Sequence, residues 1–73
     1  MIVTRKSQTD LGDLLCEQRQ RRGLTQRRLA DRMNYNNAGI SKIETAAAWP
    51  RLDVLIGLCE QLGLEIEIRE TRA

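Results

Sequence analysis

The stretch that decides the fold is residues 24–44, with the sequence LTQRRLADRMNYNNAGISKIE. Thr25 is a residue type favoured at a helix N-cap. Leu24 before it and Leu29 after it have the spacing of a hydrophobic staple. The spacing therefore predicts a short helix that begins at the threonine and ends near Met33.

A second short helix is predicted after a tight turn. Asn34 stands at the turn, and asparagine tolerates the left-handed backbone conformation better than most residues other than glycine. Asn36 can cap the next helix, which we expect over residues 37–44. Ile40 and Ile43 have the spacing of an inward-facing stripe on this helix. Two short helices joined by a turn of a few residues are thus predicted.

Four residues of the second helix lie off its apolar stripe. They are Asn37, Ala38, Ser41 and Lys42. The core needs none of them, so all four are available to contact a binding partner. A fifth residue of this helix, Gly39, costs about 1 kcal/mol relative to alanine. It either allows the backbone of a partner to approach closely or is simply tolerated, and we favour the second interpretation.

Helices are also predicted on both sides of this pair. Thr9 or Asp10 can cap a helix that runs to about Arg22, and Gly23 then supplies the left-handed residue that ends it. On the other side, a helix is expected over residues 52–62, again with a glycine directly after it. The helical part of the chain is therefore expected to contain four helices.

The hydrophobic period changes after the last helix. Residues 64–69, with the sequence LEIEIR, alternate strictly between apolar and polar side chains. This alternation predicts a strand with one buried face, and a lone strand is not stable. The strand must pair with an N-terminal strand at Ile2-Val3-Thr4, with its copy in a second subunit, or with both.

The helix at residues 52–62 has apolar side chains over most of its circumference. So wide an apolar arc is more than the core of one small domain accommodates. Together with the unpaired strand, it predicts a homodimer. The residues expected at the dimer interface are Val54, Leu58, Leu62, Leu64, Ile66 and Ile68.

The length allows one domain only. The 73 residues are expected to divide into an N-terminal arm at 1–8, a helical domain at 9–63, a dimerisation strand at 64–69 and a tail at 70–73. The fold class predicted is all-α, with a short C-terminal strand that pairs across a dimer.

Positive charge is concentrated in the first half of the chain. Residues 1–36 contain eight Lys or Arg and four acidic residues, whereas residues 37–73 contain four and six. Ten of the twelve basic residues are arginine, and arginine suits bidentate contact with phosphate. The charge pattern favours nucleic acid as a partner.

The composition argues against an enzyme and against a metal site. The chain has no histidine, the commonest general base near neutral pH, and no phosphate-binding or nucleophile motif. Cys16 and Cys59 are far apart and too few for zinc. The chain has no apolar run of signal-peptide or membrane-spanning length. We therefore expect a cytoplasmic protein with reduced cysteines and no cofactor.

The block LTQRRLADRM at residues 24–33, followed by ISKIE at residues 40–44, resembles the helix-turn-helix of the XRE/Cro/phage-repressor family. The resemblance extends over residues 11–64 and implies a lambda-repressor-like fold that binds double-stranded DNA. The predicted order of four helices followed by a short C-terminal strand resembles that of the HipB-like antitoxins. In those proteins, strands from two subunits pair into a small sheet.

The resemblance also implies roles for individual residues. The residues that would contact bases in the major groove are Asn37, Ala38, Ser41 and Lys42. The residues that would contact phosphates are Gln26, Arg27, Arg28 and Asn36. Arg19 and Glu44 match a salt bridge that in the family joins the first helix to the end of the recognition helix, which is a structural role.

The expected function is that of a homodimeric repressor on an inverted-repeat operator, with a toxin protein as a further partner if the chain is a HipB-like antitoxin. The alternative is a phage or mobile-element regulator of the Cro or anti-CRISPR-associated kind, without a toxin. Only four residues follow the strand, which argues against the longer segment that many antitoxins wrap onto the toxin but not against toxin contact through the helical body. A second alternative is an interaction module that has lost DNA binding, and the intact set of Gln26, Asn37 and Lys42 argues against it.

Overall fold

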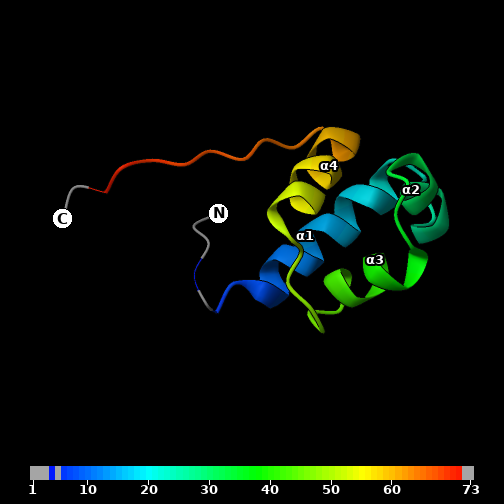
Figure 1. Cartoon of the computed structure of the whole chain (residues 1–73), viewed down its shortest axis with the longest axis horizontal. Helices are drawn as coiled ribbons and strands as arrows, with labels where there is room; N and C mark the ends of the chain where they lie inside the picture. The colour runs from blue at the N-terminus through cyan, green and yellow to red at the C-terminus, as the bar shows by residue number, and fades with distance from the viewer. Residues whose placement is uncertain (1–3, 5, 72–73) are drawn as a thin grey trace.

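A computed structural model describes residue 4 and residues 6–71 of the chain, and over these residues it contains four α-helices (Figure 1). The helices are α1 (Gln8–Arg21), α2 (Gln26–Arg32), α3 (Asn37–Glu44) and α4 (Leu52–Leu62). The predicted all-α fold is confirmed. No helix in this part of the chain is both long and apolar enough to cross a membrane.

The ends of the two central helices follow from the residues at those positions. Thr25 Oγ1 accepts a hydrogen bond from the backbone N–H of Arg28 at 3.1 Å, which caps α2. Asn36 caps α3 in the same way. Between the two helices, Asn34 has a φ of 52°, in the left-handed region that asparagine tolerates. The predicted caps and turn are confirmed.

The N-terminus of α1 differs from the prediction. The helix begins at Gln8 with Ser7 as its N-cap, rather than with Thr9 or Asp10. The reason lies in a turn just before the helix, in which the backbone N–H of Ser7 donates to the carbonyl oxygen of Thr4 at 3.0 Å. The backbone N–H of Leu11 then donates to the carbonyl of Ser7 at 2.9 Å, so the helical hydrogen bonds start at the serine.

All four helices contribute to one hydrophobic core. Its largest fully buried side chains are Leu15, Leu29, Ile40, Leu58 and Leu62. Partly buried side chains pack around them, Met33 and Tyr35 from the turn region and Val54 and Leu55 from α4 among them. The core therefore holds α3 through the face that carries Ile40 and Ile43, and the opposite face of the helix is exposed to solvent.

Two of the residues predicted for a dimer interface belong to this core instead. Leu58 is 1% exposed and Leu62 is 0% exposed, so neither is accessible to a second subunit. Val54 and Leu64 are half-buried and pack against the same core. The prediction was wrong because the chain's own hydrophobic core, to which α1 contributes Leu11 and Leu15, covers much of the apolar arc of α4. The large apolar side chains that remain exposed on this helix are Leu52 and Ile56.

The segment after α4 leaves the helical body as an extended trace (Figure 1). Gly63 ends the helix with a φ of 67°, and within the described residues no strand is formed by 64–71. Ile66 and Ile68 are 42% and 88% exposed. Of the expected N-terminal strand at Ile2-Val3-Thr4, Ile2 and Val3 lie outside the described residues, and Thr4 forms a turn with Ser7 instead of a strand.

Candidate nucleic-acid interface

The outer face of α3 carries side chains that make no contribution to the core. Asn37, Ala38 and Lys42 are exposed, and Ser41 is half-buried beside them. The opposite face of the helix is buried through Ile40, Ile43 and Glu44. Residues 37, 38, 41 and 42 therefore form one continuous surface, as the sequence predicted from the apolar spacing.

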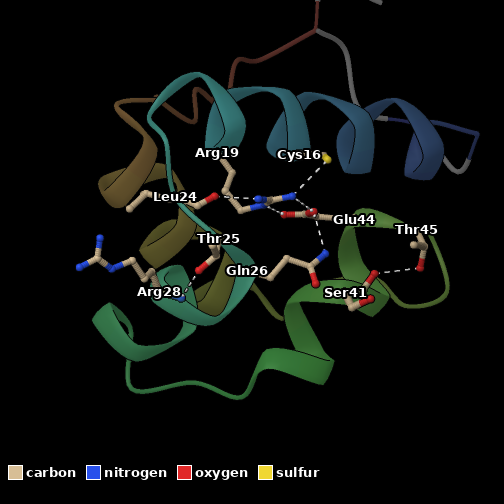
Figure 2. A network of polar contacts seen from close by, with 9 residues as sticks. All are labelled: Cys16, Arg19, Leu24, Thr25, Gln26, Arg28, Ser41, Glu44 and Thr45. Carbon is tan, nitrogen blue, oxygen red and sulfur yellow. Dashed lines mark hydrogen bonds and ion pairs between the residues drawn. The ribbon is translucent and has the colours of Figure 1, made fainter.

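Thr45 extends this surface by one further position. It was not among the residues that the sequence analysis assigned to the site. It is exposed and lies four residues after Ser41, directly beyond the last residue of α3. Its hydroxyl donates to the carbonyl oxygen of Ser41 at 2.8 Å (Figure 2). That hydrogen bond caps the helix and leaves the methyl group of Thr45 as its free end.

A buried ion pair ties α3 to α1. Arg19 Nε lies 2.8 Å from Glu44 Oε2 and Arg19 Nη2 lies 3.1 Å from Glu44 Oε1, which is a bidentate arrangement (Figure 2). The side chains are only 11% and 5% exposed. Arg19 Nη1 also donates to the carbonyl oxygen of Leu24 at 2.7 Å. One guanidinium thus joins α1, the start of the turn before α2, and the end of α3.

Gln26 joins the same network from α2. Its Nε2 donates to Glu44 Oε1 at 3.1 Å (Figure 2). Burial disfavours ionisation of Glu44, but the hydrogen bonds from Arg19 and Gln26 outweigh it and hold the pKa of the carboxyl below its ordinary value. Glu44 therefore remains an anion on which three helices converge.

The thiol of Cys16 lies at the edge of this network. Arg19 Nη2 donates to its sulfur at 3.6 Å (Figure 2). Burial and the neighbouring Glu44 carboxylate raise the pKa of the thiol above its ordinary value. The thiol is therefore protonated at neutral pH, and a protonated thiol is a poor nucleophile.

The distance between α1 and α3 depends on a glycine that the sequence did not single out. A Cβ on Gly12 would lie 2.6 Å from the carbonyl oxygen of Glu44 and 2.8 Å from that of Ile43. Only a residue without a side chain allows the backbones to approach so closely. A glycine in the middle of a predicted helix was the signal available in the sequence.

The basic residues beside α3 are free of acidic partners. Arg27 and Arg28 are exposed in the first turn of α2, and Lys42 is exposed on α3. Within the described part of the chain the ion pairs join Arg19, Arg21, Arg51 and Arg69 to acids, and none of them involves these three cations. Figure 2 shows Arg28 extending away from the polar network. Arg27, Arg28 and Lys42 are therefore exposed cations outside the ion pairs of the described residues.

The side chains expected to contact phosphate have donors left for that purpose. Gln26 uses Nε2 towards Glu44, and an amide nitrogen has two hydrogens. Asn36 uses only its oxygen, which accepts the N–H of Gly39 at 2.5 Å. Both amides lie at the N-terminal ends of helices, α2 and α3, where backbone N–H groups and the helix dipole favour anions.

Two short helices joined by a tight turn, with an exposed polar face on the second and exposed arginines on the first, are typical of a helix-turn-helix DNA-binding regulator. The chain belongs to the helix-turn-helix domain family, whose model matches residues 10–71. Within that family it is of the XRE and HipB type.

Solved structures of HipB complexes are similar over nearly the whole chain. One is a serine-to-alanine variant of HipB in complex with an O2 20mer, with 24% identity, a TM-score of 0.76, and coverage of 99% of this chain and 100% of the other. Another is a chain of the HipA-HipB-O2-O3 complex, with 25% identity, a TM-score of 0.75, and coverage of 97% and 100%. No curated protein matches the chain.

Proposed function

We propose that this protein is a sequence-specific repressor that acts as a homodimer on an inverted-repeat operator. The observation that carries the proposal is the exposed face of α3, fixed on a helix whose end is held by the buried pair of Arg19 and Glu44. Two such helices related by a two-fold axis enter successive major grooves about 34 Å apart. Binding over a promoter, including that of its own gene, excludes the polymerase.

In this proposal, the chemistry of each side chain decides whether it contacts a base or the DNA backbone. Asn37 is the main base reader, because its amide can bond adenine N6 and N7 together. Ala38 offers a methyl contact to thymine, and Ser41 and Lys42 supply polar contacts one turn further along. Gln26, Arg27, Arg28 and Asn36 hold the DNA backbone, which positions the helix without selecting sequence.

The dimer is supported by the apolar surface that the single chain leaves uncovered. Leu52 and Ile56 are exposed on α4, and Ile66 and Ile68 are exposed on the extended segment. Ile56 and Ile66 line one shallow groove together with Leu64, so the exposed face of the helix continues onto the segment. We assign these residues to the interface, with Leu64 at its edge, in place of Leu58 and Leu62.

The proposal is tested by selecting preferred sites from random duplexes and titrating binding at several salt concentrations. Asn37→Ala is expected to cost about 1–3 kcal/mol on the preferred site and to relax the sequence preference. Arg27→Ala is expected to weaken binding to all duplexes alike and to lower the salt slope by about 1.

Arg21→Ala serves as the charge control, because this exposed arginine is already paired with Glu17 and lies outside α2. It should leave the selected sequence unchanged. Identical behaviour of Asn37→Ala and Arg27→Ala would show that the assignment of base and phosphate contacts is wrong. A wild-type chain with no preference among duplexes would refute sequence-specific repression itself.

The similarity to a chain of the HipA-HipB-O2-O3 complex favours an antitoxin role in the cytoplasm, with a toxin protein as second partner. The alternative is a phage or mobile-element regulator without a toxin. Co-expression with the product of the neighbouring gene distinguishes the two. A stable complex that forms on the same operator supports the antitoxin, whereas a neighbouring gene of phage or anti-CRISPR type supports the alternative.

A further inference from the structure

Gly39 lies at a position of α3 where any side chain would collide with its neighbours. A Cβ on this residue would lie 2.6 Å from Tyr35 Cε2, 2.9 Å from Tyr35 Cζ and 2.9 Å from Asn36 Oδ1. Real Cβ atoms essentially never approach other atoms below 3.0 Å. The ring of Tyr35 and the side chain of Asn36 therefore both approach Gly39 more closely than a Cβ would allow without a shift, which the sequence did not indicate.

The position of Tyr35 in the turn is fixed through its backbone. The backbone N–H of Tyr35 donates to the carbonyl oxygen of Ala30 at 2.8 Å, and Asn34 before it holds a left-handed turn. The ring is partly buried against the core, and with Met33 and Val54 it borders the groove between the turn and α4. A side chain at Gly39 would therefore require the ring of Tyr35, α3 or both to shift.

The same side chain would also disturb the cap of α3. Asn36 Oδ1 accepts the backbone N–H of Gly39 at 2.5 Å, and this hydrogen bond sets where the helix begins. Asn37 and Ala38 lie between the two capping partners, in the first turn. The ring of Tyr35 and the cap thus fix the first turn from two directions, and both contacts meet at Gly39.

We propose that Gly39 is a positioning residue for sequence recognition, which sets the orientation of the first turn of α3 against the ring of Tyr35. The role rests on the proposed function, because it acts through Asn37 and Ala38 as base readers. A glycine in a helix interior is less stable than alanine. The chain keeps it here because the close approach of the ring places those two side chains.

The test compares wild type with Gly39→Ala, Tyr35→Leu and the double variant. Leucine lacks the ring atoms Cε2 and Cζ, so it removes the collision with residue 35 and leaves the one with Asn36 Oδ1. Gly39→Ala should lose about tenfold in affinity for the wild-type site, the scale of one base contact, and should select a different sequence from random duplexes. The double variant should recover the part of the affinity that the ring collision costs, and so bind measurably more tightly than Gly39→Ala. Tyr35→Leu alone should show a smaller loss than Gly39→Ala.

Gly57→Ala is the matched control, because Gly57 lies within α4 and a Cβ there meets only the flexible end of Met33, at 3.2 Å. It should leave affinity and selected sequence unchanged. Circular dichroism establishes that each variant is folded. An unfolded Gly39→Ala chain that Tyr35→Leu restores supports the contact, and one that it does not restore overturns it.

Gly39→Ala with wild-type affinity and an unchanged selected sequence overturns the positioning role while leaving the proposed function intact. Equal losses in Gly39→Ala and in the double variant overturn it as well. Failure of the proposed function is seen separately, in the wild-type arm, as binding to all duplexes with equal affinity.

Discussion

Glu44 is one carboxylate shared by three helices. It belongs to α3, accepts two hydrogen bonds from Arg19 of α1, and accepts a third from Gln26 of α2. In the described part of the chain, no buried side-chain nitrogen or oxygen lacks a hydrogen-bond partner. The orientation of the proposed DNA-binding face therefore depends on a polar group that never contacts DNA in our proposal.

Arg19→Ala should destabilise the fold more than it alters recognition. Removing one partner of a buried ion pair leaves the other charge unpaired and costs about 3–5 kcal/mol. The control is Arg21→Ala, which breaks the exposed pair with Glu17 and should cost at most about 1 kcal/mol. Chemical denaturation measures both, and equal stabilities of the two variants would contradict a structural role for Arg19. Arg19→Lys keeps the charge without the bidentate geometry and should fall between them.

Stability should decline in acid because of the same carboxylate. The pKa of Glu44 is lower in the folded chain than in the unfolded chain, where it has an ordinary value of about 4.3. Its contribution is therefore complete above that pH and is lost as pH falls through the lower, folded pKa. Carboxyl-carbon NMR titration of Glu44 checks this directly. A midpoint at or above the ordinary value would contradict the geometry of the network.

At the level of elements, the approach of α1 to α3 predicts the effect of a single methyl group. Gly12→Ala places a Cβ against the carbonyl oxygens of Ile43 and Glu44, which cannot swing aside as a side chain can. Overpacking of this kind costs about 1–3 kcal/mol. Gly57→Ala is the control, since it adds the same methyl beside a flexible methionine. Thermal denaturation should show a lower midpoint for Gly12→Ala only.

Most element boundaries could be predicted because they depend on neighbours in sequence. Thr25, Asn36 and the glycines after α1 and α4 act through their own backbone conformation or through bonds spanning three residues. The start of α1 was misplaced, because Ser7 and Thr4 form a turn whose geometry their residue types do not specify.

The sequence predicted which residues lie on the outer face of α3. It did not predict the contacts that hold this helix in position. The outer face of α3 follows from the spacing of Ile40 and Ile43. The contacts of Gly12 and Gly39 do not, because they depend on which backbone or ring comes close in three dimensions. For the same reason the apolar arc of α4 was assigned to a second subunit, although Leu58 and Leu62 face the core of their own chain.

For the whole molecule, a homodimer should be observed in solution. Light scattering is expected to give about 17 kDa, twice the 8.4 kDa of one chain. Ile68→Glu should shift the protein towards monomer without unfolding it, because Ile68 is 88% exposed and absent from the core. Operator affinity should fall in parallel, since two half-sites are no longer bound together. A wild-type monomer at micromolar concentration would contradict this assembly.

One contact far from α3 has a consequence for the distance between half-sites. Arg22, at the end of α1, donates from Nε to the carbonyl oxygen of Leu62 at 2.9 Å, and so fixes where the extended segment departs from α4. If two chains pair through residues 64–71, the direction in which these residues leave α4 determines the distance between the two copies of α3. The residues of α3 would then determine which bases are preferred, and the junction between α4 and the extended segment would determine the spacing of the half-sites. Mutations during evolution could therefore change one property without changing the other.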